Sequence, residues 1–336
     1  MRLEDVAKRA KVSIATVSRA VNNVGPMKGA TRARVLKAIQ ELKYYPNIHA
    51  RHLAGVKSNT VGMVVSNLAN PFFLDIFRSL ENEAHRRGYD VLVANTDYNP
   101  RQLAVSVRMM MGRRLAGLAV IVSEMEPRLM QELAESTLPV LVFDVVAPTG
   151  NIRSIRIRYE KCIQRVVEYL HSMGHRRMAF VGHHAELDPL QERKRSFLDT
   201  MKRYAGEVAH TVVTDRDSPA GGQQATRALL ASGFKPSAII CVNDFMALGV
   251  LKELREQGLA VPRDVSVTGY DNISLSEFAA PPLTTVNIPR EEIGRMAFSA
   301  LVPDEHATDA ASGHGREYLI DPELVIREST GPARKS

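Results

Sequence analysis

The sequence predicts an α/β protein in which a small, basic, helical head precedes two lobes built on doubly wound parallel sheets. Residues 1–60 carry 12 Lys and Arg against 3 Asp and Glu, whereas the whole chain has a net charge of only +7. From about residue 58, short apolar segments alternate with helical segments, a pattern typical of buried parallel strands joined by crossover helices. At 336 residues and 45% hydrophobic content, the chain can bury the cores of two or three domains.

Composition excludes several classes of protein. No segment approaches the roughly 18 uninterrupted apolar residues of a transmembrane helix. Glu4 and Asp5 stand where a signal peptide needs an apolar run, so we expect a cytoplasmic protein. Cys162 and Cys241 are too few and too far apart for a disulfide framework or a Cys-based zinc site.

The head is predicted to form three short helices. The first has an apolar stripe at helical spacing, made of Leu3, Val6, Ala7 and Ala10. Ser13 is the expected N-cap of a second helix over 14–22, whose inward residues are Val17 and Val21. Thr31 is expected to cap a third helix that ends at Leu42, with an inward face of Val35, Leu36, Ala38, Ile39 and Leu42.

The first two helices and the short turn between them fit a helix-turn-helix unit, whose second helix enters the major groove of DNA. A generic three-helix bundle or a solvated basic face is the alternative. The positive charge and the small, polar outer face of the second helix favour DNA. Arg19 can reach O6 and N7 of a guanine, and Ile14 and Ala15 can contact a thymine methyl group.

The remaining chain is predicted to contain nine strands, which suit two lobes better than one sheet. Asn70 and Pro71 form an N-cap and first helical position, and that helix is expected to run to about Arg87 and stop at Gly88. The strands are expected near 60–65, 91–94, 119–122, 140–143, 178–181, 212–214, 238–242, 265–267 and 284–287.

Polar residues follow several of these strands. Ligands of such sheets bind beyond the carboxyl ends of the strands, and this rule selects Asn70, Asp144, Asn243 and Asp271. Phe72 or Phe73 could stack on an apolar face of a ligand. Helix capping is the alternative role for Asn70, and it is the favoured role for Asp244.

Several spaced motifs resemble the LacI/GalR family of bacterial transcription regulators. They are Leu3-Glu4-Asp5-Val6-Ala7, Val12-Ser13-Ile14-Ala15-Thr16-Val17-Ser18-Arg19 with Asn22, and Tyr44-Tyr45-Pro46-Asn47. The similarity continues along nearly the whole chain to Thr330. It implies a homodimer that binds a pseudo-palindromic DNA operator, a small-molecule effector that changes operator affinity, and a two-lobed domain with the fold of periplasmic sugar-binding proteins. No leucine-heptad tail follows Thr330, which favours a dimer over a tetramer.

The resemblance also implies roles for residues of the head. Ile14, Ala15 and Arg19 match positions that read bases, and Ser13, Thr16 and Ser18 match positions that mainly contact phosphates. Residues 47–55 match a hinge helix, in which Leu53 would wedge into the minor groove. A flexible linker is the alternative for this segment. The full expected DNA-binding set is Ser13, Ile14, Ala15, Thr16, Ser18, Arg19, Asn22, Ala50, Arg51 and Leu53.

These inferences divide the chain into a DNA-binding domain (1–46), a hinge helix and linker (47–58), an effector-binding and dimerisation domain (59–331) and a tail (332–336). By the resemblance, the first lobe comprises about 59–153 and 287–315, and the second about 154–286 and 316–331. Residues 304–315 are expected to form a surface loop.

Two arginines are added to the effector site by comparison with the family. Arg193 matches a ligand-facing arginine; a surface charge is its alternative role. Arg158 stands where the family usually has an Asp, so the chain loses an acid and gains a cation. This change makes an anionic effector, such as a sugar phosphate or sugar acid, a hypothesis to test.

No sequence motif indicates an enzyme. The glycine-rich nucleotide loops, the H-E-x-x-H motif and the G-x-S-x-G motif are missing, so we expect no catalytic residue, no metal and no cofactor. A solute-binding receptor or a sugar-processing enzyme with a basic head is the alternative. The sequence therefore predicts a DNA-binding regulator, and the resemblance to the family implies a repressor.

Overall fold

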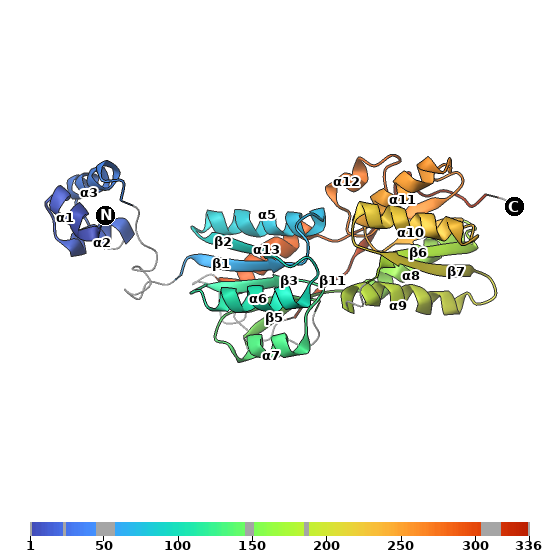
Figure 1. Cartoon of the computed structure of the whole chain (residues 1–336), viewed down its shortest axis with the longest axis horizontal. Coiled ribbons are helices and arrows are strands. Elements are labelled where there is room, and N and C mark those ends of the chain that lie inside the picture. The colour runs from blue at the N-terminus through green and yellow to red at the C-terminus, as the bar shows by residue number, and fades with distance from the viewer. Residues whose placement is uncertain are drawn as a thin grey trace. The chain divides into compact units, whose positions relative to one another are not determined.

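A computed structural model describes residues 2–22, 25–44, 58–144, 151–184, 188–303 and 317–334. The chain divides into two compact units, Met1–Ser58 and Asn59–Ser336 (Figure 1). Within the described residues, no helix is both long and apolar enough to cross a membrane.

The N-terminal unit contains three helices, α1 (Leu3–Ala10), α2 (Ile14–Asn22) and α3 (Gly29–Glu41). Ser13 caps α2 as predicted, because its Oγ accepts a hydrogen bond from the Thr16 N–H at 3.2 Å. The three helices enclose a small core of Val6, Ala7, Ala10, Val17, Ala20, Val35 and Ala38. The basic head therefore has a core of its own.

The third helix differs from the prediction. It begins at Gly29 after an extended Lys28, so Thr31 lies inside the first turn and does not cap it. Leu36 was expected to face inward, but it is 52% exposed. Val35 and Ala38 occupy the core, and Leu36 is rotated about 100° around the helix from Val35.

The first lobe of the second unit is a parallel sheet with the strand order β11-β5-β4-β3-β1-β2. Helices α5 (Pro71–Arg86) and α13 (Arg290–Leu301) cover one face, and α6 (Pro100–Met111) and α7 (Pro127–Glu135) cover the other (Figure 1). The strands are β1 (Thr60–Val65), β2 (Asp90–Asn95), β3 (Gly117–Ile121), β4 (Val140–Phe143), β5 (Ile152–Ile157) and β11 (Glu317–Ile320).

The apolar composition of β1 follows from burial on both sheet faces. Met63 and Val65 belong to the core cluster on the α5 side. Val64 points the other way and packs in a second cluster with Leu103 and Val107 of α6. Because successive side chains of a strand alternate between faces, a strand covered by helices on both sides is apolar throughout.

The second lobe has a parallel sheet with the order β7-β6-β8-β9. Its strands are β6 (Arg177–His183), β7 (Ala209–Asp215), β8 (Ala238–Cys241) and β9 (Ser266–Thr268). Its helices are α8 (Tyr159–Ser172), α9 (Asp188–Arg203), α10 (Pro219–Ala231), α11 (Asp244–Glu256) and the short α12 (Ser274–Glu277). Strands β10 (Thr285–Asn287) and β12 (Glu323–Val325) form a separate antiparallel pair.

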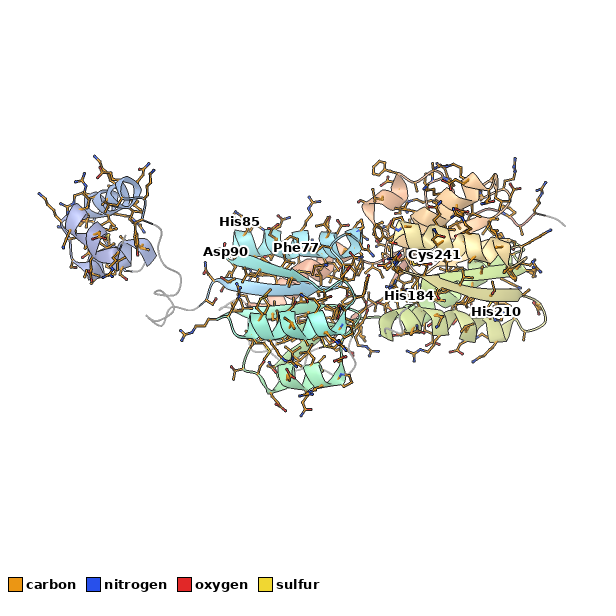
Figure 2. All side chains as sticks on the ribbon, in the orientation of Figure 1. Phe77, His85, Asp90, His184, His210 and Cys241 are labelled. Atoms are coloured by element: carbon orange, nitrogen blue, oxygen red, sulfur yellow. The ribbon has the colours of Figure 1, made fainter. Side chains whose placement is uncertain are left out.

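Both cysteines are free thiols buried in this lobe, and Figure 2 labels Cys241. Burial raises the pKa of the Cys162 thiol to about 12 and that of Cys241 well above its ordinary value. Both thiols therefore stay protonated and pack as small apolar groups.

The lobe boundaries expected at about 153/154 and 315/316 lie a few residues before the crossings that the structure shows. Strands β5 and β11 both belong to the sheet of the first lobe, so the chain crosses between lobes near residue 158 and near residue 321. These strands and β12 were absent from the prediction. The charged residues Arg153 and Arg156 interrupt the apolar run of β5, and this hid the strand from a search for continuous apolar segments. The remaining crossing lies between β10 and α13. The expected loop at 304–315 lies outside the described residues.

Candidate functional site

The outer face of α2 carries small and polar side chains around one arginine. Ile14, Ala15 and Arg19 are exposed, while Thr16 and Ser18 are half-buried. The Arg19 Nε donates a long hydrogen bond of 3.4 Å to the Ala15 carbonyl. The hydroxyls of Ser13 and Thr16 lie 2.8 Å apart at the start of the helix. The side chain of Asn22, and Ala50, Arg51 and Leu53 as whole residues, lie outside the described part of the chain.

A small cavity lies between the two lobes at the carboxyl ends of their strands. Its enclosed space is about 20 Å³, enough for roughly one water molecule. Seven of the eight residues predicted for the effector site line it: Asn70, Phe72, Phe73, Asp144, Arg193, Asn243 and Asp271. Tyr98, Ser123, Phe143 and Tyr159 complete the lining. The fold thus gathers residues that lie as far apart as positions 70 and 271.

Arg193 on α9 is held rigidly at this cavity. Its guanidinium carbon lies 4.6 Å and 4.4 Å from the ring centroids of Tyr159 and Tyr270, which contact it from adjacent sides. Nη1 donates to the Val242 carbonyl at 2.7 Å, and Nη2 lies 3.5 Å from Oδ1 of Asp271. The residue is only 5% exposed, so the predicted arginine is a buried, oriented cation rather than a surface charge.

Asp144 ends β4 with a left-handed backbone conformation, at φ 54°. Its Oδ1 accepts the Ile157 N–H at 2.9 Å, and its Oδ2 accepts a hydrogen bond from the Tyr159 hydroxyl. Burial raises the pKa of Asp144 to about 7, although these hydrogen bonds and Arg193 act to lower it.

Asp271 has a similar electrostatic position in the second lobe. Burial raises its pKa to about 7, against the lowering effect of Arg193 and Arg290. Its Oδ1 accepts no hydrogen bond, and its backbone adopts φ 102°, a value that side-chain-bearing residues rarely adopt. Such local strain is often found where a binding site requires a particular side-chain direction.

Asp217 joins the two lobes, and the sequence analysis did not select it. Its Oδ2 accepts hydrogen bonds from the Tyr98 hydroxyl and, at 3.2 Å, from Nδ2 of Asn70, both in the first lobe. Its Oδ1 accepts from Nδ2 of Asn243 in the second lobe at 2.6 Å. Asp217 lies two residues beyond the end of β7, so the strand-end rule that found Asp144 could also have found it.

Arg158 does not join the cavity, which corrects its assignment to the effector site. It precedes α8, and its Nη1 donates to both carboxylate oxygens of Asp321 at 3.1 Å. Its side chain is 40% exposed in this ion pair. The crossing from β5 into α8 turns Arg158 toward the β11 end of the sheet, where its N–H also donates to the Ile320 carbonyl. The hypothesis of an anionic effector therefore loses the arginine on which it depended.

Two asparagines of the cavity also cap helices. Oδ1 of Asn70 accepts the Phe72 N–H at 3.1 Å, and Oδ1 of Asn243 accepts the Met246 N–H at 2.8 Å. Their amide nitrogens are thereby turned toward Asp217. Asp244 was expected to be a cap and is not, because Asn243 takes that role. The buried Asp244 instead accepts from the Thr285 hydroxyl at 2.5 Å and the Ile273 N–H at 2.8 Å.

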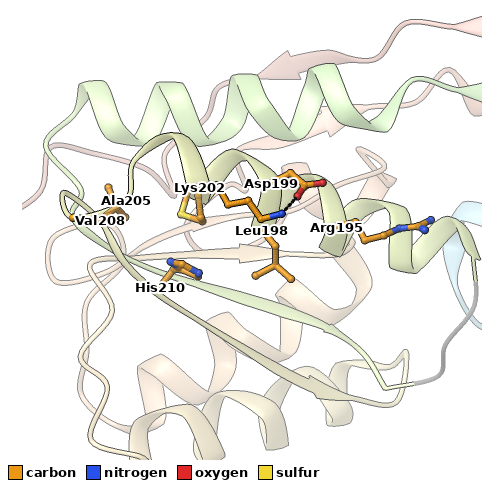
Figure 3. A pocket seen from close by; sticks show the side chains of 9 residues that line it. Arg195, Leu198, Asp199, Lys202, Ala205, Val208 and His210 are labelled. Carbon is orange, nitrogen blue, oxygen red and sulfur yellow. Dashed lines mark hydrogen bonds and ion pairs between the residues drawn. The ribbon is translucent and has the colours of Figure 1, made fainter.

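Other hollows of the second unit contain few of the predicted residues. An outer pocket of about 580 Å³ is lined by Tyr98, Asp217 and His184, among others, and it borders the inner cavity at Tyr98. A groove of about 730 Å³ lies between α9 and β7, where Lys202 pairs with Asp199 at 2.6 Å (Figure 3). None of the predicted effector residues lines that groove, so we assign the site to the strand ends. No cluster of metal-ligating side chains occurs among the described residues.

Comparison with known proteins accounts for both units. Residues 2–47 match the family described as bacterial regulatory proteins, lacI family, and residues 167–330 match a periplasmic binding protein-like domain. The HTH-type transcriptional repressor CytR of Escherichia coli is 32% identical, over 98% of this chain and 96% of the relative. The HTH-type transcriptional repressor PurR of Photobacterium profundum is 31% identical, over 97% and 98% of the two chains.

Solved structures agree with these relatives. A crystal structure of the lac repressor dimer, bound to operator and the anti-inducer ONPF, has a TM-score of 0.83 and 28% identity and covers 98% of this chain and 99% of its own. A LacI family regulator from Silicibacter pomeroyi has a TM-score of 0.85 at 25% identity, with the same coverage. The helix-turn-helix unit, the two-lobed domain and the similarity over almost the whole length lead to one conclusion: this chain belongs to the LacI/GalR family of bacterial transcription regulators.

Proposed function

We propose that this protein is a homodimeric repressor whose affinity for a pseudo-palindromic operator is controlled by a small-molecule effector bound between its lobes. The convergence of seven separately predicted residues on one cavity carries the proposal. The effector is proposed to be a sugar or sugar derivative. We also place the protein in the cytoplasm, where it can reach chromosomal DNA.

The exposed face of α2 supports the DNA-binding part. Arg19 is proposed to read a guanine, Ile14 and Ala15 to contact bases, and Ser13, Thr16, Ser18 and Asn22 to contact or position the phosphate backbone. Residues 47–58 are proposed to form the hinge, with Ala50, Arg51 and Leu53 at the minor groove. A hinge of about two turns is too short to be stable alone, so it should order only on DNA.

The cavity supports the effector part. Its polar groups come from both lobes, so a ligand that bonds to both would favour one arrangement of the lobes over another. Ligand sites usually enclose several hundred cubic ångströms, far more than the 20 Å³ found here. The lobes must therefore separate to admit an effector. This movement offers a physical route from ligand binding to the spacing of the two DNA-binding heads.

Exposed apolar side chains support the dimer. The first lobe exposes Leu74, Val93, Val105 and Met109, and the second exposes Leu275 and Phe278, the latter at 82%. Large exposed apolar groups on a folded domain often mark surfaces of association. A two-fold dimer would present two copies of α2 to the two halves of a palindrome.

The proposal is tested by mapping the genomic sites that the protein occupies and titrating the recovered duplex against the purified chain. Operator affinity should fall with salt by about 0.9 log units per log unit of salt for each phosphate neutralised. Removal of residues 1–57 should abolish DNA binding and leave ligand binding intact. Equal affinity of the full chain for recovered and random duplexes, with and without candidate ligands, would contradict the proposal.

A further inference from the structure

We propose that the effector is a small organic cation of sugar size, such as an amino sugar, and that its protonated amine binds to Asp217. The inference rests on the proposed function, because it takes the cavity between the lobes as the effector site. It differs from the anionic effector considered from the sequence, and it follows from the charges that the fold brings together.

The charged residues that line or border the cavity do not balance. Asp144 and Asp271 line it, Asp217 is bonded to Asn70 and Asn243 of its lining, and the only cation in that lining is Arg193. Arg193 is already paired with Asp271 at 3.5 Å and is fixed by the Val242 carbonyl. Arg193 is therefore already paired, and neither Asp144 nor Asp217 forms an ion pair with a described residue of the lining, although Arg193 lowers the pKa of Asp144.

The partners of these two carboxylates are neutral. Asp217 accepts hydrogen bonds from Tyr98, Asn70 and Asn243, and Asp144 accepts from Tyr159 and from a backbone N–H.

Among the charged groups that lie further away, Arg216 lines the outer pocket together with Asp217, but no described hydrogen bond or ion pair joins these two side chains. Glu192 acts on Asp144 and Glu124 acts on Tyr98, and both are acids. Arg290 donates to the Asp271 carbonyl and lowers the pKa of the Asp271 carboxyl, but it is itself paired with Asp75 at 3.0 Å. A cationic ligand would relieve the repulsion among these carboxylates, whereas an anion would increase it.

The apolar wall of the cavity suits a cation as well. Phe72, Phe73, Phe143 and Tyr98 form a continuous aromatic surface, with ring centroids 5.1 Å apart for Phe72–Phe73, 6.0 Å for Phe72–Phe143 and 6.4 Å for Phe73–Tyr98. Aromatic faces attract ammonium groups, and the attraction grows when both partners are desolvated. The wall also accepts the apolar face of a ring.

Two buried atoms in the lining lack hydrogen-bond partners. They are Oδ1 of Asp271 and Nε of Arg193, on residues that are 3% and 5% exposed. Buried polar atoms are rarely left unpaired, and an unpaired one in a cavity indicates a group that a ligand should satisfy. Asp271 requires a donor and Arg193 an acceptor, and the hydroxyl groups of a sugar ring provide both.

Opening of the lobes would expose the amine site. The bond from Tyr98 to Asp217 spans the lobes, so it must break when they separate far enough to admit a ring. Asp217 would keep its bond from Asn243, which lies in its own lobe, and would have one oxygen free. An ammonium group could then replace the Tyr98 hydroxyl and form a charge-assisted hydrogen bond.

Calorimetric titration of the full-length dimer with matched ligands tests the proposal. The probes are glucosamine, galactosamine and mannosamine, their parent hexoses, their N-acetyl forms and the corresponding hexuronates. At least one amino sugar should bind ten-fold or more tightly than its parent and its N-acetyl form, and no hexuronate should bind.

In the variant Asp217→Asn, the ratio of the affinity for the amino sugar to the affinity for the parent hexose should fall at least ten-fold. Asp199→Asn is the matched control, because Asp199 lies exposed on α9 and pairs with Lys202; it should change nothing. Thermal unfolding of both variants verifies that they fold.

Three results would overturn the inference. The first is a hexose or hexuronate that binds at least as tightly as the tightest amino sugar, and the second is that no amino sugar binds. The third is an Asp217→Asn variant that prefers the amino sugar over its parent hexose as strongly as wild type does. Operator titration of the same samples separates this failure from failure of the proposed function. If a neutral sugar releases the protein from the operator and no amino sugar does, the proposal of a cationic effector fails, but the proposed function as an effector-controlled repressor stands.

Discussion

Asp217 in the second lobe accepts a hydrogen bond from the hydroxyl of Tyr98 in the first, and this pair closes the space between the lobes. The same carboxylate holds Asn70 and Asn243, one from each lobe. One buried carboxylate therefore connects the two halves of the domain at the point where a ligand would enter. The state of this contact should determine how readily the lobes separate.

Replacing Tyr98 with Phe should loosen the closed arrangement while keeping the ring in the aromatic wall. A hydrogen bond to a charged group contributes about 1.5–3 kcal/mol, so opening should become roughly 10- to 100-fold more frequent. Amide hydrogen exchange of residues 215–221 should accelerate accordingly. Tyr89→Phe is the control, since Tyr89 packs on Phe298 in the first lobe; equal exchange in both variants would show that the Tyr98 hydroxyl does not restrain the lobes.

Arg19→Ala should weaken binding to the specific site by about 1–3 kcal/mol and leave binding to random DNA nearly unchanged. The physical reason is the loss of a bidentate contact to a base edge, which random DNA does not provide. The measurement is a pair of titrations on the two duplexes. Arg9→Ala removes an arginine of the same unit that pairs with Glu41, and it should not reduce specificity. Equal losses on both duplexes would exclude Arg19 from base reading.

Two arginines near the lobe boundary should differ sharply in their effect on stability. Arg158→Ala breaks an exposed ion pair with Asp321 and should cost at most about 1 kcal/mol. Arg193→Ala leaves Asp271 buried without its cation and should cost about 3–5 kcal/mol. Urea unfolding of both variants measures the difference. Similar losses would mean that burial does not distinguish the two pairs.

Asp244 should make stability depend on pH. Burial raises its pKa from 3.8 to about 8, so the folded state keeps a proton that the unfolded state releases above pH 4. Titration of Asp244 therefore lowers the free energy of unfolding steadily as the pH rises from about 4 to 8. Above pH 8 this contribution no longer changes. Asp271 contributes most to the raised pKa after burial, while Thr285, Ile273 and Arg290 lower it.

Asp244→Asn removes this titration. The free energy of unfolding of the variant minus that of wild type should increase as pH rises from 5 to 8 and then level off, because only wild type loses stability through this group. Denaturant unfolding at several pH values measures this difference, and the comparison cancels the contribution of Asp144, whose pKa is also raised. Parallel curves for the two proteins would show that Asp244 is already ionised in the fold.

Local patterns predicted much of the structure. The helix starts at Ser13 and Asn70 were correct, because a capping side chain bonds to N–H groups only two or three residues away. Thr31 and Asp244 were wrong for a related reason: several polar residues near a helix start can act as the cap, and the surrounding packing selects one. Strand β5 was missed because Arg153 and Arg156 break its apolar run.

The sequence alone determined most of the elements and most of the residues that meet at the cavity, because strand ends in parallel sheets converge at one edge. It did not reveal that Arg158 turns away to Asp321, or that Asp217 bonds to Tyr98 across 119 positions. Only the tertiary structure decided those contacts, and with them the charge of the site. Periodicity and capping act over a few residues, whereas the partners of a charged side chain depend on how distant segments pack.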